Sequence, residues 1–158
     1  MIIRSLNASP LLNYVGYAMK QIQFLTRQVI FDQAVVHLLA QRKAALLPRG
    51  GGAYYGGDGT CPVGNMIEAR DYATWIEGVP VRYISTHMKD VPQHLRAGAD
   101  ALKRALMRAH IDIEDTLTVS LLTRLQTLHD AFGVWEWRRR LKSIASGFGL
   151  SDGILASN

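Results

Sequence analysis

A glycine-rich segment at residues 49–66 constrains the fold of this chain more than any other feature of its sequence. Pro48 and the run Gly50-Gly51-Gly52 end any helix before them, because proline lacks an amide donor and glycine disfavours helical backbone. Two short β-prone stretches then flank the turn Gly57-Asp58-Gly59. This pattern predicts a small β-hairpin within residues 53–63.

Helical periodicity dominates on both sides of this segment. After Thr26, apolar residues recur at i, i+3, i+4 and i+7, which predicts a helix to about Ala45. Start signals at residues 90–92 and near Asp115 predict two more helices, and a last helix is expected over 134–148. The apolar stripes are expected to bury Phe31, Ala34, Val35, Leu38, Leu95, Ala99, Leu102, Leu106, Leu121, Leu125, Leu128, Phe132, Trp137, Leu141, Ile144, Ala145 and Phe148.

Three further elements have shorter sequence signals. Ser9-Pro10 is typical of a helix start, with a hydroxyl cap before a proline in the first turn. Residues 66–76 favour a short helix. Residues 79–84 are apolar and β-branched, which favours a strand that Pro80 would place at a sheet edge.

The domain organisation follows from length and composition. The chain has 158 residues, of which 48% are hydrophobic and 20% charged, so it can bury a core without disulfides. We predict a mainly α fold of the α+β kind, with about five helices and the hairpin as an insertion. Residues 19–150 should form the single domain. Residues 1–18 should be an extension or a first helix outside the core, with Met19 as an alternative start of translation, and residues 151–158 a flexible tail.

The single cysteine and the net charge limit the cellular compartment and the classes of partner that the sequence predicts. Cys61 has no second cysteine with which to form an intramolecular disulfide, which favours a reducing compartment, and we predict a cytoplasmic protein. No apolar run is long enough for a membrane helix, so no membrane contact is expected. The net charge of +5 permits attraction to nucleic acid or to acidic proteins without choosing between them.

Catalytic, cofactor and metal chemistry find little support in the sequence. No lysine follows the glycines as a phosphate loop requires, and one cysteine with five scattered histidines gives no metal-binding spacing, so we expect neither cofactor nor metal. Cys61 and His129 are the only catalytic candidates. The helical spacing turns His129 toward the apolar face and Asp130 away from it, so we expect a buried histidine bonded to backbone rather than a catalytic dyad.

The strongest candidate for binding is the basic cluster at residues 138–142 of the last helix. Arg139, Arg140 and Lys142 are expected to point outward, and Trp135 lies just off the apolar stripe. An exposed tryptophan beside arginines is typical of an interaction hot spot, whereas the plainer alternative is a solvated helix face. The predicted binding residues are Trp135, Arg139, Arg140, Lys142, Arg104 and Arg108.

Three segments together resemble a group of small uncharacterised proteins of bacteria and their phages. They are GTCPVGNMI at residues 59–67, LQTLHD at 125–130, and the pattern WxxxLxxIA at 137–145. The resemblance extends over about residues 24–150. It implies a phage or prophage context, and it implies no reaction.

Three functions are therefore left open. The first hypothesis is a non-enzymatic binding protein that acts by protein–protein contact with an unknown partner. An alternative is a nucleic-acid-binding accessory protein that uses its basic C-terminal helix. The second alternative is an enzyme that depends on Cys61.

Overall fold

The computed structural model describes residues 23–85 and 90–157. Within them the α-helices are α2 (Arg27–Gln41), α3 (Arg96–Arg108), α4 (Thr116–Ala131), α5 (Val134–Gly147) and α6 (Gly153–Ala156). Strands β1 (Tyr55–Gly56) and β2 (Gly59–Thr60) pair antiparallel, with Tyr55 opposite Thr60. The mainly α fold with a small hairpin insertion is thus confirmed. The helix expected to open at Ser9-Pro10, and the extension over residues 1–18, lie outside the described residues.

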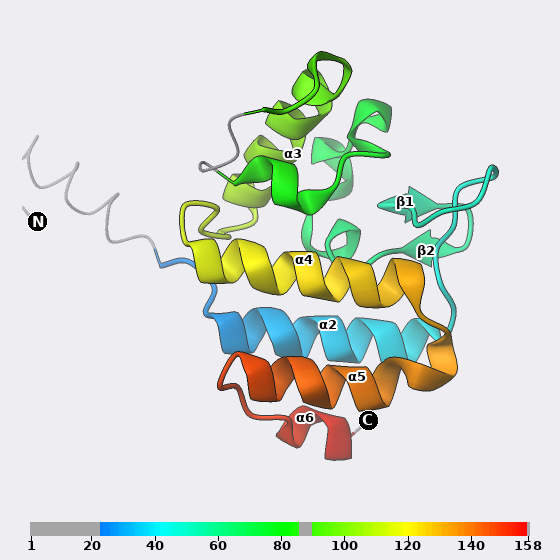
Figure 1. Cartoon of the computed structure of the whole chain (residues 1–158), viewed down its shortest axis with the longest axis vertical. Helices are drawn as coiled ribbons and strands as arrows, with labels where there is room; N and C mark the ends of the chain where they lie inside the picture. Colours follow the sequence, from blue (N-terminus) through cyan, green and yellow to red (C-terminus); the bar gives the residue numbers. More distant parts are fainter. Residues whose placement is uncertain (1–22, 86–89, 158) are drawn as a thin grey trace, which may run out of the picture.

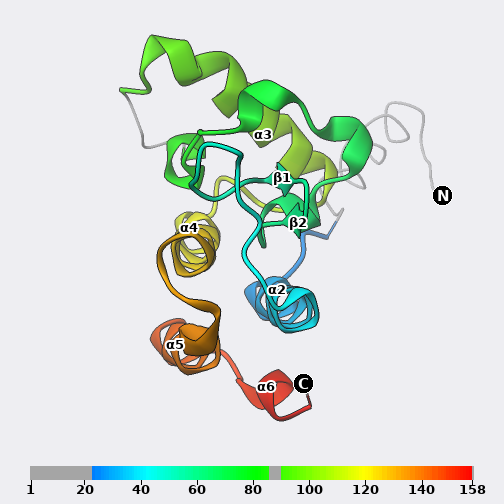
Figure 2. The same cartoon turned by 90° about the vertical axis from the view of Figure 1, so that its right-hand side faces the viewer.

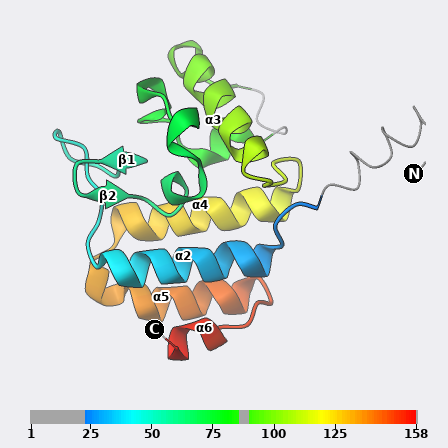
Figure 3. The same cartoon turned by 180° about the vertical axis from the view of Figure 1, so that it is seen from behind.

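The longer helices are arranged in layers. Helices α2, α4 and α5 lie side by side, and α6 packs against α2 at the edge of this group (Figure 1). Helix α3 lies on the other side of α2 and α4 from α5 (Figure 2). The hairpin lies near the C-terminal end of α2, as seen from behind in Figure 3. Hydrogen bonds from the side chains of His37 and Gln41 to Thr60 hold it there.

Short 3₁₀ helices fill the space between the hairpin and α3. They span Gly64–Met66, Ala69–Asp71, Thr74–Ile76, Val81–Ile84 and Gln93–Leu95. The strand expected over residues 79–84 is therefore wrong, and the helix expected over 66–76 is broken into 3₁₀ turns. The Val81 amide donates to the Gln126 side chain at 3.0 Å, so it is bonded to α4 and not to a neighbouring strand.

Glu77 orders this irregular region. Its carboxylate accepts the backbone N–H groups of Tyr54 and Tyr55 at 2.9 and 3.0 Å, and the Tyr72 hydroxyl at 2.6 Å. The Tyr55 and Tyr72 rings stack with their centroids 4.5 Å apart. One acceptor therefore satisfies donors from two segments that have little regular secondary structure.

The backbone conformation at the helix ends explains why the observed helix bounds differ from the predicted ones. Helix α2 ends at Gln41 rather than near Ala45, because Arg42 takes a left-handed conformation with φ 61° and its N–H bonds to the Leu38 carbonyl. Helix α4 begins where the sequence predicted a helix start, and there Asp115 caps the N–H of Leu117 at 3.1 Å. Gly149 follows α5 with φ 66°.

The core lies between the helices and beneath the 3₁₀ segment. Of the expected core residues, Leu95, Phe132 and Phe148 are only partly buried, and the others are buried. The segment after Ser151, which we expected to be a flexible tail, forms α6 and buries Leu155. Gln28 and Ser151 exchange two hydrogen bonds of 3.0 and 2.8 Å, which fix the chain as it enters α6. No helix in the described part of the chain has the length and apolarity needed to cross a membrane.

Candidate functional site

His129 and Asp130 form a polar contact at the C-terminal end of α4. The His129 Nε2 accepts the N–H of Ala45 at 2.9 Å, so this nitrogen carries no proton. The proton is thereby assigned to Nδ1, which donates to Asp130 Oδ1 at 2.6 Å. His129 is buried and bonded to backbone as predicted, and Asp130 lies on the exposed side of α4, but the expectation that the two side chains do not contact each other is wrong. Asp130 lies one residue before the end of α4, and its side chain bends back to Nδ1.

The glycine-rich segment approaches this contact closely. A Cβ at Gly52 would lie 1.9 Å from Asp130 Oδ1 and 2.2 Å from its Cγ. Ala53 donates its N–H to the Ala45 carbonyl at 2.9 Å, which keeps Gly52 against the end of α4. Position 52 is therefore a glycine because a side chain there would collide with the Asp130 carboxylate.

A hollow of about 340 Å³ opens beside Asp130. Asp130, Gln126 and Thr127 line it from α4, and Arg82 and Tyr54 line it from the irregular region. The Tyr54 hydroxyl donates to the Val79 carbonyl at 2.5 Å. Burial raises the pKa of Tyr54 far above its usual value, so its hydroxyl stays a neutral donor. No sequence pattern indicated this hollow, because its walls come from segments far apart along the chain.

Cys61 has the environment of a packed core residue. Its side chain is buried, and its Sγ accepts the N–H of Gly64 at 3.3 Å. Burial raises the pKa of the Cys61 thiol to about 12, so the nucleophilic thiolate is scarce at neutral pH. The nearby His37 bonds instead through Nε2 to the Thr60 carbonyl at 2.7 Å. Neither Cys61 nor His129 has the geometry of a nucleophile with its base.

The predicted binding residues of α5 lie on the surface, but their charges are partly matched. Trp135 is 84% exposed, and Lys142 is exposed. Glu136 pairs with Arg140 at 2.9 Å and with Arg139 at 3.5 Å. The Arg140 guanidinium also lies 3.5 Å from the centroid of the Phe132 ring. Intramolecular contacts therefore reduce the positive field that Arg139 and Arg140 present to solvent.

Arg104 and Arg108 lie on α3, away from α5 (Figure 2). Both are exposed, but Arg108 contacts Asp71 at 2.6 Å. The Asp71 side chain is only 5% exposed, and its Oδ2 has no hydrogen bond in the described structure. The structure thus does not bring the two basic groups together, and Arg108 has a structural partner.

A groove that no sequence motif indicated runs between α2 and the start of α5. It has a volume of about 350 Å³. Its walls include Val36 and Ala40 of α2, Arg42 directly after α2, and Val134 and Arg138 of α5. A second hollow on α2 shares Val36 and Ala40 with it. The sequence feature that could have indicated the groove is the apolar pair Val36 and Ala40, four residues apart and outside the core stripe of α2.

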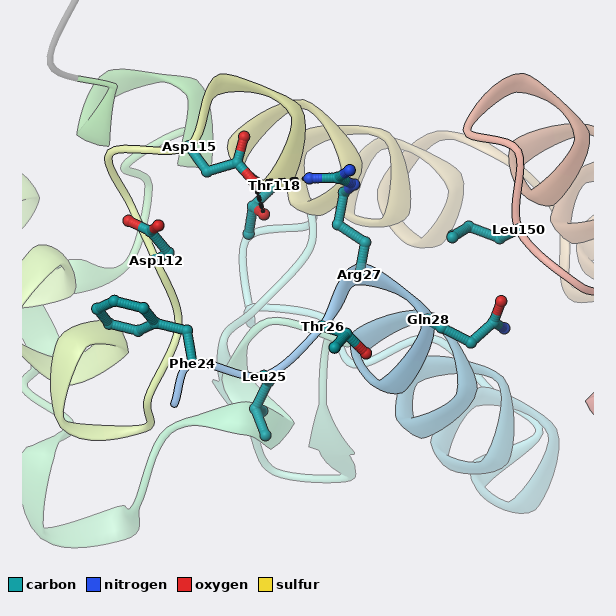
Figure 4. A pocket seen from close by; sticks show the side chains of 9 residues that line it. All are labelled: Phe24, Leu25, Thr26, Arg27, Gln28, Asp112, Asp115, Thr118 and Leu150. Carbon is teal, nitrogen blue, oxygen red and sulfur yellow. Dashed lines mark hydrogen bonds and ion pairs between the residues drawn. The ribbon is translucent and has the colours of Figure 1, made fainter. Parts of the chain in front are cut away.

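A further cavity, of about 420 Å³, lies at the start of α2 (Figure 4). Its charged groups bond to one another: Arg27 contacts Asp115 Oδ2 at 2.6 Å, and the Thr118 hydroxyl donates to the same oxygen at 2.9 Å. Partial burial raises the pKa of Asp115, but the bonds from Thr118, Leu117 and Arg27 outweigh it and lower the pKa overall. This arrangement caps α4 and ties it to α2.

The described residues contain no group of histidine, cysteine or acidic side chains that could hold a metal ion. Comparisons of the chain with protein-family models, with curated proteins and with solved structures find no significant match.

Proposed function

We propose that this protein is a non-enzymatic binding protein that contacts a partner protein through the surface where α5 begins. The observation that carries the proposal is the exposure of Trp135, at 84%, next along the chain to Val134, which lines the groove between α2 and α5. Tryptophan and arginine are among the side chains most enriched at binding hot spots. We call the region the Trp135 surface and define it as Val36, Ala40, Arg42, Val134, Trp135 and Arg138.

The charge of the groove indicates the chemistry of the partner. Its lining contains two arginines and no acidic residue. Arg42 makes no ion pair within the described structure, and Arg138 donates to the backbone carbonyl of Leu155. A partner segment with apolar side chains flanked by acidic ones would complement this surface, and an acidic amphipathic helix has that pattern. The resemblance to small proteins of bacteria and phages makes a bacterial host protein part of the proposal.

Nucleic acid is the weaker candidate for this surface. Backbone phosphates are bound by clusters of uncompensated lysines and arginines. Here Glu136 already pairs with both Arg139 and Arg140, and Arg104 and Arg108 lie on another side of the molecule.

The test compares two exposed tryptophans in capture experiments from a bacterial lysate. Trp135→Ala should abolish capture of a specific protein, because it removes the anchor of the surface. Trp75→Ala is the matched control, since Trp75 is 60% exposed but lies on the 3₁₀ helix Thr74–Ile76, which packs against α3. Arg42→Glu should also weaken capture, by reversing the charge that faces the acidic partner.

Three results would contradict the proposal. Equal loss of capture in Trp135→Ala and Trp75→Ala would indicate nonspecific apolar adhesion. Binding to duplex DNA that falls steeply with salt and is lost in a combined alanine variant of Arg139, Arg140 and Lys142 would favour the nucleic-acid alternative. A dimer in sedimentation that Trp135→Ala dissociates would show that a second copy of the chain occupies the surface.

A further inference from the structure

The hollow beside Asp130 carries two opposite charges that do not neutralise each other. Asp130 and Arg82 both line it, yet they form no ion pair within 4.0 Å. The Arg82 guanidinium makes no ion pair within the described structure and lies 5.0 Å from the centroid of the Tyr83 ring. Asp130 uses Oδ1 for His129, while Oδ2 has no hydrogen bond in the described part of the chain. The hollow therefore presents one anionic and one cationic group at separate positions on its wall.

The anionic group is held in place by a chain of contacts that ends in backbone. The Ala45 amide fixes the proton of His129 on Nδ1, and that proton fixes Asp130 Oδ1. His129 is itself buried, so its ring cannot turn to another partner. Gly52 leaves room for the carboxylate on one side. Such preorganisation lowers the entropic cost of binding a ligand to Asp130.

The neutral wall adds hydrogen-bonding capacity. Thr127 is an exposed residue of the lining, and its hydroxyl can donate and accept. Gln126 is anchored by accepting the Val81 N–H at 3.0 Å. A hollow of about 340 Å³ is at the small end of the range for ligand sites, so it fits a compact molecule rather than a nucleotide.

We propose that this hollow binds a small zwitterion of the free amino acid class. The ligand's ammonium group contacts the free oxygen of Asp130, its carboxylate contacts the Arg82 guanidinium, and the Thr127 hydroxyl bonds to its polar atoms. A singly charged ligand would leave one of the two protein charges without a partner. Complementary pairing of both charges is thus the basis of selectivity. The site is separate from the Trp135 surface, and the inference does not depend on the proposed protein contact.

The experiment titrates the purified full chain with individual L-amino acids, using ligand-observed NMR and calorimetry. The comparison probes are ethylammonium and propionate, which each carry one of the two charges. We expect at least one amino acid to bind with a Kd below about 10 mM, and both singly charged probes to bind at least about tenfold more weakly.

Variants then locate the bound ligand. Asp130→Asn keeps an oxygen that can accept from His129 but removes the charge, and Arg82→Gln removes the opposite charge. Each should weaken binding by about tenfold or more. Arg124→Gln is the matched control, because Arg124 lies on α4 and does not line this hollow. Trp135→Ala should leave the affinity unchanged, which separates this inference from the proposed protein contact.

The alternative outcomes each overturn the inference. Absence of binding by every amino acid at about 10 mM would remove it. Equal binding of ethylammonium and of an amino acid would leave a simple cation site. Unchanged affinity in both Asp130→Asn and Arg82→Gln, with melting curves that show folded proteins, would place the ligand elsewhere.

Discussion

Gly52→Ala tests whether the Asp130 carboxylate, rather than backbone conformation, dictates the glycine at position 52. The added Cβ would lie 1.9 Å from Asp130 Oδ1, whereas ordinary contacts begin at 3.4 Å. The carboxylate must therefore move by about 1.5 Å, which breaks its 2.6 Å bond to His129. Gly52 does not have positive φ, so backbone strain adds nothing to the effect.

The expected magnitude combines two opposing effects on stability. A buried His129 Nδ1–H left without a partner costs about 1–3 kcal/mol. Replacing glycine by alanine at a compatible φ reduces the entropy of the unfolded chain and stabilises by about 0.4–1 kcal/mol. The loss of the hydrogen bond outweighs the entropic gain, so we expect Gly52→Ala to lower the free energy of unfolding by about 1–2 kcal/mol.

The same substitution should change sign when Asp130 is already alanine. The His129 bond is then absent before position 52 is changed, and only the stabilising effect on the unfolded chain is left. Urea unfolding followed by circular dichroism measures all four proteins of this double-mutant cycle. Gly57→Ala is the matched control, because it also lacks positive φ and a Cβ there would meet nothing within 4 Å.

Two results would refute this reasoning. One is a free energy of unfolding for Gly52→Ala equal to that of Gly57→Ala. The other is additivity of the changes at positions 52 and 130 within about 0.5 kcal/mol, which would show that the two residues do not interact.

Three further predictions concern single side chains. Because burial raises the pKa of Cys61 to about 12, a thiol reagent at neutral pH should label the folded protein only as fast as it opens, and labelling at the rate of a free thiol would contradict this. Arg108→Ala should lower the free energy of unfolding by about 1–3 kcal/mol, because it strands the buried carboxylate of Asp71, whereas Arg104→Ala should stay within about 0.5 kcal/mol in the same urea assay. The pKa of Asp115 is lowered in the folded state, so its contribution is present above the unfolded value of about 3.9 and is lost as the pH falls through the lower folded value. Asp115→Asn should therefore be less stable than wild type at pH 7, and a difference that persists at about pH 2 would oppose this reasoning.

The sequence predicted the elements whose cause is local. The buried stripe of α2 repeats with helical spacing, and Asp115 lies at a helix start. Neighbouring residues along the chain therefore determine both. The hairpin follows from glycines at its turn. Residues a few positions apart are enough to indicate these elements, which is why periodicity and turn composition sufficed to predict them.

The features that the sequence did not predict depend on contacts between distant segments. Residues 79–84 have β-branched composition, but the Val81 amide bonds to Gln126, which is 45 positions away. The Asp130 side chain turns back because the Ala45 amide, 84 positions before His129, selects the tautomer of that ring. The chain after Ser151 is ordered by Gln28, 123 positions earlier. Local propensity carries no information on such pairs.

The Glu77 carboxylate has a consequence for how the molecule opens. It accepts two backbone amides of the hairpin segment and the Tyr72 hydroxyl, so displacement of this one side chain removes all three hydrogen bonds together. Strands of two residues have almost no stability of their own. The hairpin and the 3₁₀ segment should therefore form one cooperative unit that unfolds before α2, α4 and α5. In hydrogen exchange, the amides of Tyr54 and Tyr55 would share a single opening free energy, below that of the helical core.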